Sequence, residues 1–199
     1  MTRTHDGSRE SGRTLMEVVV VAALVAVGLA IAVPQLKAYA VESHLMGAAR
    51  QFKGTFRLAR STAIRLGVYT AIRFERAGTV WRYSVYADGD SDGVQSSDIA
   101  SGRDWRVAGP LPLDAGAVGV RLGINANVPA IPPETGWLDP NDDPIRFGAD
   151  MLSFSPLGTA TPGTLYIAGE TRQAAVRVTA GSARVRMLVC RGRVWQEQP

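Results

Sequence analysis

The densest group of side chains that could do chemistry is an acidic segment near the middle of the chain. It reads Asp88-Gly-Asp-Ser-Asp-Gly-Val94 and is followed by Asp98. Carboxylates at alternate positions, a glycine for the turn and a backbone carbonyl form the first half of a calcium-binding loop. The calcium ligands that this pattern predicts are Asp88, Asp90, Asp92, the Val94 carbonyl and Asp98.

Two interpretations of this acidic segment stay open. An EF-hand loop has a bidentate glutamate at its twelfth position, where this chain has Ile99. Asp98 could therefore ligate calcium only in a different geometry. The alternative is a solvated acidic turn at the end of a hairpin, which binds no metal.

A second group consists of arginines close to the C-terminal end. Its members are Arg172, Arg177, Arg184, Arg186, Arg191 and Arg193. Arg184 and Arg186 alternate, so a strand would present both on one face, where they could bind phosphate. A solvated strand face is the alternative. The net charge of +4 and the pI of about 9.6 do not by themselves indicate a nucleic-acid partner.

The sequence offers no arrangement typical of an enzyme. Its two histidines, His5 and His44, lie in the N-terminal part, away from the segments predicted to form the globular head. No phosphate loop, dinucleotide fingerprint or nucleophile elbow is found. Cys190 is the single cysteine, so it cannot form an internal disulfide, and its apolar neighbours predict a buried core thiol. We expect no catalysis and no cofactor other than calcium.

The elements that position these groups begin with an apolar N-terminal segment. Residues 1–12 are polar and without periodicity, and an unbroken apolar run follows from Val18 to Val33. A helix over this run spans roughly 24 Å, and adding Leu15 and Met16 brings it close to the thickness of a hydrocarbon core. The sequence therefore predicts a transmembrane part at about 15–33.

Glu17 is unusual because it lies inside this apolar segment, where a carboxylate is costly and needs a partner. One candidate partner is Arg13, one helical turn earlier. The other is the free amino terminus of a neighbouring subunit, created by cleavage just before Arg13. A secretory signal peptide ending at Ala38-Tyr-Ala40 is the alternative, and it would leave a soluble protein that begins at Val41.

A helical pattern continues beyond Pro34. One apolar face is formed by Phe52, Phe56, Ala59, Ala63 and Leu66. Gly67 is suited to end the helix. The sequence predicts one helix from about 14 to 66, kinked at Pro34, apolar all round at first and amphipathic afterwards.

From Val68 the pattern changes to that of strands. A hairpin is predicted over 68–86, with Arg76-Ala-Gly78 at its turn. Further strands are predicted at 105–107, 118–122, 151–154, 163–168, 174–179 and 183–189. Residues 88–143 are rich in Gly, Pro, Asp and Asn, which indicates a variable loop region or a decorated sheet edge. The predicted fold class is α+β, with an antiparallel sheet system packed on the amphipathic half of the helix.

Gly12-Arg-Thr-Leu-Met-Glu17-Val-Val-Val-Val resembles the class III signal of type IV pilins and type II secretion pseudopilins. In that family a prepilin peptidase cuts after the glycine and a glutamate lies fifth in the mature chain. The resemblance implies cleavage between Gly12 and Arg13, with Glu17 as the assembly and methylation signal. Arg13 departs from the N-methylated phenylalanine that the family usually has, which leaves methylation open.

Two later segments look like the GspH/FimT branch of the minor pilins. They are Ala59-Arg-Ser-Thr-Ala-Ile-Arg-Leu-Gly67 and Phe154-Ser-Pro-Leu-Gly158-Thr-Ala-Thr-Pro-Gly163-Thr-Leu-Tyr-Ile. Some members of this branch bind DNA through a Gly-Arg-x-Arg element on a C-terminal strand. Ala183 precedes Arg184 here, so the glycine of that element is missing, and DNA capture is the lesser hypothesis.

The resemblance implies a minor pilin or pseudopilin, a structural and assembly subunit of a type II secretion pseudopilus or a type IV pilus. It divides the chain into a leader at 1–12, a long helix at 13–66 and a β-rich periplasmic head at 67–199. The expected partners are the prepilin peptidase, other pilin subunits and the inner membrane, which the chain crosses once. The alternative is a secreted or membrane-anchored module that binds a ligand through the calcium-like loop or the arginine face.

Overall fold

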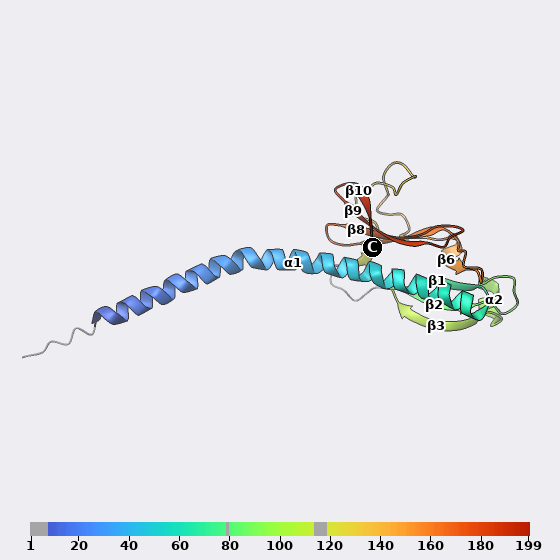
Figure 1. Cartoon of the computed structure of the whole chain (residues 1–199), viewed down its shortest axis with the longest axis horizontal. Helices are drawn as coiled ribbons and strands as arrows, with labels where there is room; N and C mark the ends of the chain where they lie inside the picture. The colour runs from blue at the N-terminus through green and yellow to red at the C-terminus, as the bar shows by residue number, and fades with distance from the viewer. Residues whose placement is uncertain (1–7, 79, 114–118) are drawn as a thin grey trace, which may run out of the picture. The chain divides into compact units, whose positions relative to one another are not determined.

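The computed structural model describes residues 8–78, 80–113 and 119–199, with the side chains of 8–14 and 33–38 left out of the description. The chain divides into two compact units, residues 1–40 and 41–199. Each unit is described by itself below. Figure 1 shows the elements in chain order.

A single long helix, α1 (Ser8–Leu66), belongs to both units. It begins at Ser8, so the prediction of a start near residue 14 was wrong. Starting a helix fixes about three residues for one hydrogen bond, whereas extending it fixes one residue per bond, so polar residues 8–12 can extend the helix. The helix ends where Gly67 takes φ +69° and its N–H donates to the Ala63 carbonyl at 3.0 Å. Pro34 lies among the residues whose side chains the structure does not describe, so the predicted kink there stays a prediction.

The head, residues 41–199, contains two antiparallel sheets, as the α+β prediction requires. The first has the order β3-β2-β1-β6, with β1 (Thr70–Ala77), β2 (Val80–Ala87), β3 (Trp105–Pro112) and β6 (Met151–Phe154). The predicted hairpin is confirmed, because β1 pairs antiparallel with β2 from Thr70↔Ala87 to Ala77↔Val80. Gly78 takes φ +67° in its turn, a conformation that favours glycine.

The second sheet has the order β10-β9-β8-β7-β4, and β5 also pairs with β7. Its strands are β4 (Arg121–Leu122), β5 (Ile145–Arg146), β7 (Gly163–Ala168), β8 (Gln173–Val178), β9 (Val185–Arg191) and β10 (Val194–Gln198). The predicted strands at 151–154 and 163–168 are found at those bounds. Those at 174–179 and 183–189 are shifted by one or two residues.

Several elements were not predicted. They are α2 (Ser96–Ser101), β5, a 3-10 turn η1 (Gly148–Asp150), the second half of β3, and β10. The sequence Val-Trp-Gln-Glu-Gln of β10 has too few apolar residues to signal a strand, since this strand lies at the edge of the sheet and is mostly exposed. Because β3 is the edge of the first sheet, residues 88–143 are in part a decorated sheet edge.

The main core of the head lies between α1 and the inner faces of both sheets. Phe52, Phe56, Ala59 and Ala63 of the helix are buried there with residues of both sheets. Figure 1 shows the C-terminal half of α1 running along the labelled strands. Leu66 was predicted on the same face but is 40 % exposed, because the helix ends there and little remains to cover it.

A smaller core covers the opposite face of the second sheet. Residues 124–138 lie over Tyr166, Ala175 and Leu188, and bury Ile124, Val128, Ile131 and Leu138. Cys190 packs at the margin of this cluster and is partly buried, so the prediction of a buried core thiol is confirmed only in part. Burial nevertheless raises the pKa of the Cys190 thiol.

Candidate functional site

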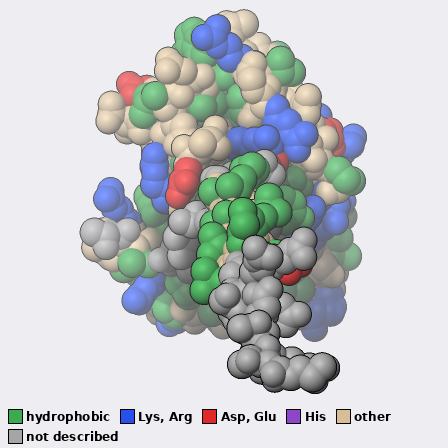
Figure 2. All heavy atoms as spheres, turned by 90° about the vertical axis from the view of Figure 1, so that its left-hand side faces the viewer, with side chains coloured by type: hydrophobic (Ala, Val, Ile, Leu, Met, Phe, Trp, Pro, Cys, Tyr) green, Lys and Arg blue, Asp and Glu red, His purple; other side chains and the backbone are tan. Residues whose placement is uncertain are grey.

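The first candidate surface is the apolar part of α1 itself. Leu15–Ala32 is long and apolar enough to cross a membrane, with a mean hydropathy of 2.7, and none of it is buried in the structure. Its large side chains are mostly more than half exposed, as for Leu15 and Met16 at 70 % each. Figure 2 shows hydrophobic side chains in green gathered on this part of the molecule. In water such a surface calls for a lipid or protein partner.

Glu17 lies at the start of this apolar surface and is exposed. It shares one patch of the helix with Val18, Val21 and Ala22. The backbone of Gly12 and Arg13 belongs to α1. The Arg13 side chain is not described by the structure, so the predicted Arg13–Glu17 pair remains a prediction. A carboxylate on an otherwise apolar helix face is costly in lipid unless a cation pairs with it.

The acidic segment after β2 brings together the carboxylates that the sequence predicted as calcium ligands. Oxygens of Asp90, Asp92 and Asp98 lie within 4.8 Å of one another, and those of Asp88 and Asp90 form a second group with Asp104. Asp104 was missed, since it is separated from the loop in sequence and directly precedes β3. No spacing rule connects it with the carboxylates of the loop.

Asp88 and Asp104 are buried, and they serve as acceptors for the backbone of their own loop. Asp88 accepts hydrogen bonds from the N–H groups of Asp90, Ser91 and Gly93 at 2.8 to 3.1 Å. Asp104 accepts from Gly89 at 3.0 Å and from Gln95 at 2.9 Å. These bonds satisfy the loop N–H groups that would otherwise lack partners.

The other carboxylates of the loop have protein partners as well. The Arg103 guanidinium lies 2.8 Å from Asp98 and 3.3 Å from Asp90. Asp92 accepts from the Gln95 side chain at 2.8 Å. Val94 turns its side chain into a small core with Ala71 and Tyr86. The arrangement thus holds a turn together and supplies a cation, Arg103, among the acidic groups.

Arg184 and Arg186 were predicted to share a strand face. The structure places both beside Glu197 of β10: Arg184 lies 3.0 Å from one carboxylate oxygen and Arg186 lies 3.6 Å from the other. Opposite Arg186 in the register stands Arg177, which pairs with Glu134 at 3.1 Å. Part of the positive charge of this face is therefore neutralised within the chain.

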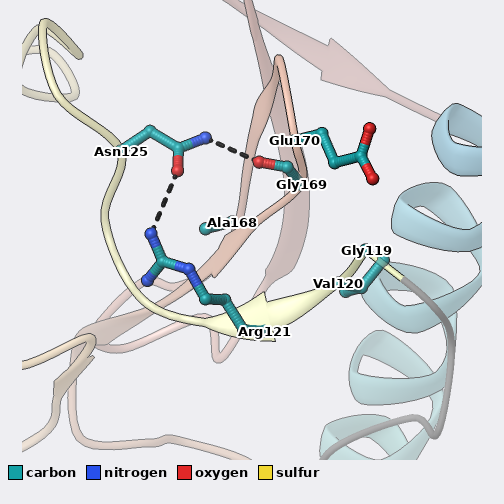
Figure 3. Close-up of a pocket in the computed structure, with 7 residues that line it drawn as sticks. All are labelled: Gly119, Val120, Arg121, Asn125, Ala168, Gly169 and Glu170. Carbon is teal, nitrogen blue, oxygen red and sulfur yellow. Dashed lines mark hydrogen bonds between the residues drawn. The ribbon is translucent and has the colours of Figure 1, made fainter. Parts of the chain in front are cut away.

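A pocket of about 370 Å³ lies between β4 and the turn that joins β7 to β8 (Figure 3). Asn125 accepts from the Arg121 guanidinium at 3.3 Å and donates to the Gly169 carbonyl at 2.9 Å. Glu170 extends from the same turn. Among its lining residues, which the structure describes, no nucleophile stands beside a general base. The Asn125 hydrogen bonds hold the loop after β4 in place, and the described lining residues offer no catalytic group.

Comparison with known proteins gives one finding. Residues 48–182, more than half of the chain, match the family model described as type II transport protein GspH. The match begins within α1 and extends through the head to the turn before β9, so it reaches neither the apolar segment nor strands β9 and β10. No curated protein and no solved structure gives a significant match.

Proposed function

The chain belongs to the GspH family of type II transport proteins, and on that basis we propose that it is a membrane-anchored pseudopilin that assembles with other pilin-like subunits in a secretion machine. The family supports a structural and assembly role in type II secretion and no enzymatic one. It is a GspH/FimT-type minor pilin by this match, as the two sequence segments at 59–67 and 154–167 indicated.

The proposal rests on two features that occur in one chain. A head that matches the family is continuous in sequence with an exposed apolar helix, Leu15–Ala32. In the proposed cycle this helix first resides in the inner membrane with the head in the periplasm. It then leaves the bilayer by packing among the equivalent helices of neighbouring subunits, which bury the same apolar side chains.

The finer steps of the proposal rest on the segment around Gly12. A prepilin peptidase cuts between Gly12 and Arg13, removes residues 1–12 and exposes a new amino terminus. That cationic terminus offers Glu17 of an adjacent subunit the partner that its apolar surroundings require. N-methylation would fall on Arg13. The machine is a type II secretion pseudopilus, with a type IV pilus as the second candidate.

Deletion of the gene tests the proposed function. We expect loss of secreted substrates in the culture medium, or of surface pili, and restoration by the full chain. Glu17→Ala should fail to restore the phenotype although the protein still accumulates in the membrane, whereas Glu75→Ala, an exposed carboxylate on β1, should restore it. Intact secretion and piliation after deletion would overturn the proposal.

A further inference from the structure

A basic pocket lies on the head between α1 and the hairpin that joins β8 to β9. Its volume is about 370 Å³. Lys53, Arg57 and Arg60 line it from the helix, and Arg184 lines it from the hairpin. The three helix residues stand at i, i+4 and i+7, which places them on one side of α1. Buried Ala183, which takes φ +46°, brings the hairpin against the helix.

Cationic side chains outnumber acidic ones around this pocket by four to one. Glu197 is the single acidic side chain that lines it, and it is engaged by Arg184 at 3.0 Å and Arg186 at 3.6 Å. Burial, together with repulsion by Arg57, Arg184 and Arg50, lowers the pKa of Lys53 despite the attraction of Glu197. A site that disfavours its own cation in this way favours an added anion.

Glu197 shows that the cationic side chains of this pocket can bind a carboxylate. Its carboxylate accepts from Arg184 at the edge of the pocket, in the geometry expected of a carboxylate–guanidinium hydrogen bond. Lys53 and Arg57 line the helix side of the same pocket, and no ion pair is found for either among the residues that the structure describes. They are therefore placed to receive a second carboxylate.

Apolar side chains adjoin the pocket at Arg60. Its Nε donates to the Gly158 carbonyl at 3.2 Å and so holds the turn at 156–158 against α1. Leu157, at the tip of that turn, is 91 % exposed, and Ile64 on the helix is 52 % exposed. A methyl group added at Gly158 would lie 3.5 Å from the Ile64 side chain, which shows how closely the turn approaches it.

We propose that the basic pocket and the adjoining Leu157 and Ile64 form the docking surface for a neighbouring pilin-like subunit. That subunit inserts an Asp or Glu side chain between Lys53 and Arg57 and lays an apolar side chain on Leu157. The inference rests on the proposed function, because it is assembly that brings another head to this surface. Arginine beside exposed apolar residues is characteristic of protein interfaces, whereas phosphates of a nucleic acid would use the cations but not Leu157.

The test is made in cells with the full chain and its own secretion machine. Leu157 is replaced by the photo-crosslinker p-benzoylphenylalanine, and the crosslinked peptide is identified by mass spectrometry. We expect a pilin-like subunit with an Asp or Glu in that peptide. Lys53→Glu with Arg57→Glu should reduce the crosslink about tenfold or more, because an inserted carboxylate then meets like charges. An Asp or Glu to Arg substitution in the crosslinked segment should restore it.

A matched control is the pair Arg82→Glu and Arg106→Glu, two exposed arginines on β2 and β3. It changes the net charge equally and should leave the crosslink intact. The milder pair Lys53→Gln and Arg57→Gln, checked by its thermal unfolding, separates lost docking from lost folding. An unchanged crosslink in the reversed pair overturns the inference, as does a crosslink to a protein without a nearby carboxylate.

Two further outcomes are distinguishable. If gene deletion impairs secretion but the Lys53 and Arg57 reversals behave like the control, the docking surface is wrong and the proposed function stands. The second outcome concerns binding of a labelled single-stranded oligonucleotide by the full chain in detergent at low salt. If only the Lys53 and Arg57 variants lose that binding, and cells carrying these variants still secrete normally, the partner is nucleic acid and the inference is overturned.

Discussion

The ring of Phe56 on α1 packs edge-on against the ring of Phe147, with centroids 5.8 Å apart and planes inclined at 83°. Phe74 of β1 completes the group, stacked on Phe147 at 5.6 Å and edge-on to Phe56 at 6.3 Å. Three segments far apart in the sequence therefore meet at one aromatic cluster. Because Phe147 follows the irregular region 88–143, this contact fixes where that region rejoins the core.

Phe56→Ala should remove the centre of this cluster. Phe56 has no exposed surface, so truncation leaves a cavity and should lower the free energy of unfolding by about 3–5 kcal/mol. Denaturant unfolding of the full chain in detergent, followed by the circular dichroism of the head, measures the effect. Leu58→Ala is the control, since Leu58 is 68 % exposed and should change stability by less than about 0.5 kcal/mol. Equal effects of the two variants would contradict the described core.

Gly163→Ala should also destabilise the head, by crowding the same cluster. The added methyl carbon would lie 2.2 Å from the Phe147 ring and 2.4 Å from the Arg146 carbonyl oxygen, so the ring or the strand must move. We expect a loss of about 1–3 kcal/mol. Gly54→Ala is the opposite case, because nothing lies within 4 Å of its added carbon and alanine favours helix by about 0.5–1 kcal/mol. A stabilising Gly163→Ala would show that the strand is placed differently.

The acidic loop should depend on its own hydrogen bonds more than on calcium. Asp88→Ala removes the acceptor of three backbone N–H groups in a buried position, and should lower stability by about 2–3 kcal/mol. Asp92→Ala, at an exposed position with one side-chain partner, should change it little. Because Arg103 already supplies a cation, isothermal titration with millimolar calcium should give no binding heat. A calcium heat that Asp88→Ala abolishes would establish the metal loop instead.

The alkaline pH dependence of stability should report Lys53. Its pKa is lowered in the folded head, mainly by burial and then by Arg57, so the unfolded chain binds its proton more tightly than the folded chain does. The free energy of unfolding contributed by this group therefore rises with pH between the lowered pKa and its ordinary value of 10.5. Below that window the charge opposes folding. Lys53→Met should raise the melting temperature at pH 7, and the gain should shrink as the pH rises through that window. A gain that grows with pH would contradict this.

Local pattern was enough for much of the head and failed where tertiary contacts decide. The runs at Met151–Phe154 and Gly163–Ala168 are β-rich and bounded by turn residues, so their ends were predictable. Strand β10 was not, because its polar residues form a strand only by pairing with β9. Asp104 and Glu197 were not predicted for a related reason. Each contacts residues distant in sequence, and no spacing rule connects them with Asp88 or Arg184.

The mass of the mature protein tests the central claim most directly. Intact mass spectrometry of the full chain purified from the membranes of its own cells reads the amino terminus without assumption. The account predicts a chain that begins at Arg13, with or without one added methyl group, and that shifts to the unprocessed mass when Gly12 is replaced by a bulky residue. A mature chain that begins at Val41 would contradict it, because the apolar helix would then have been removed as a signal peptide.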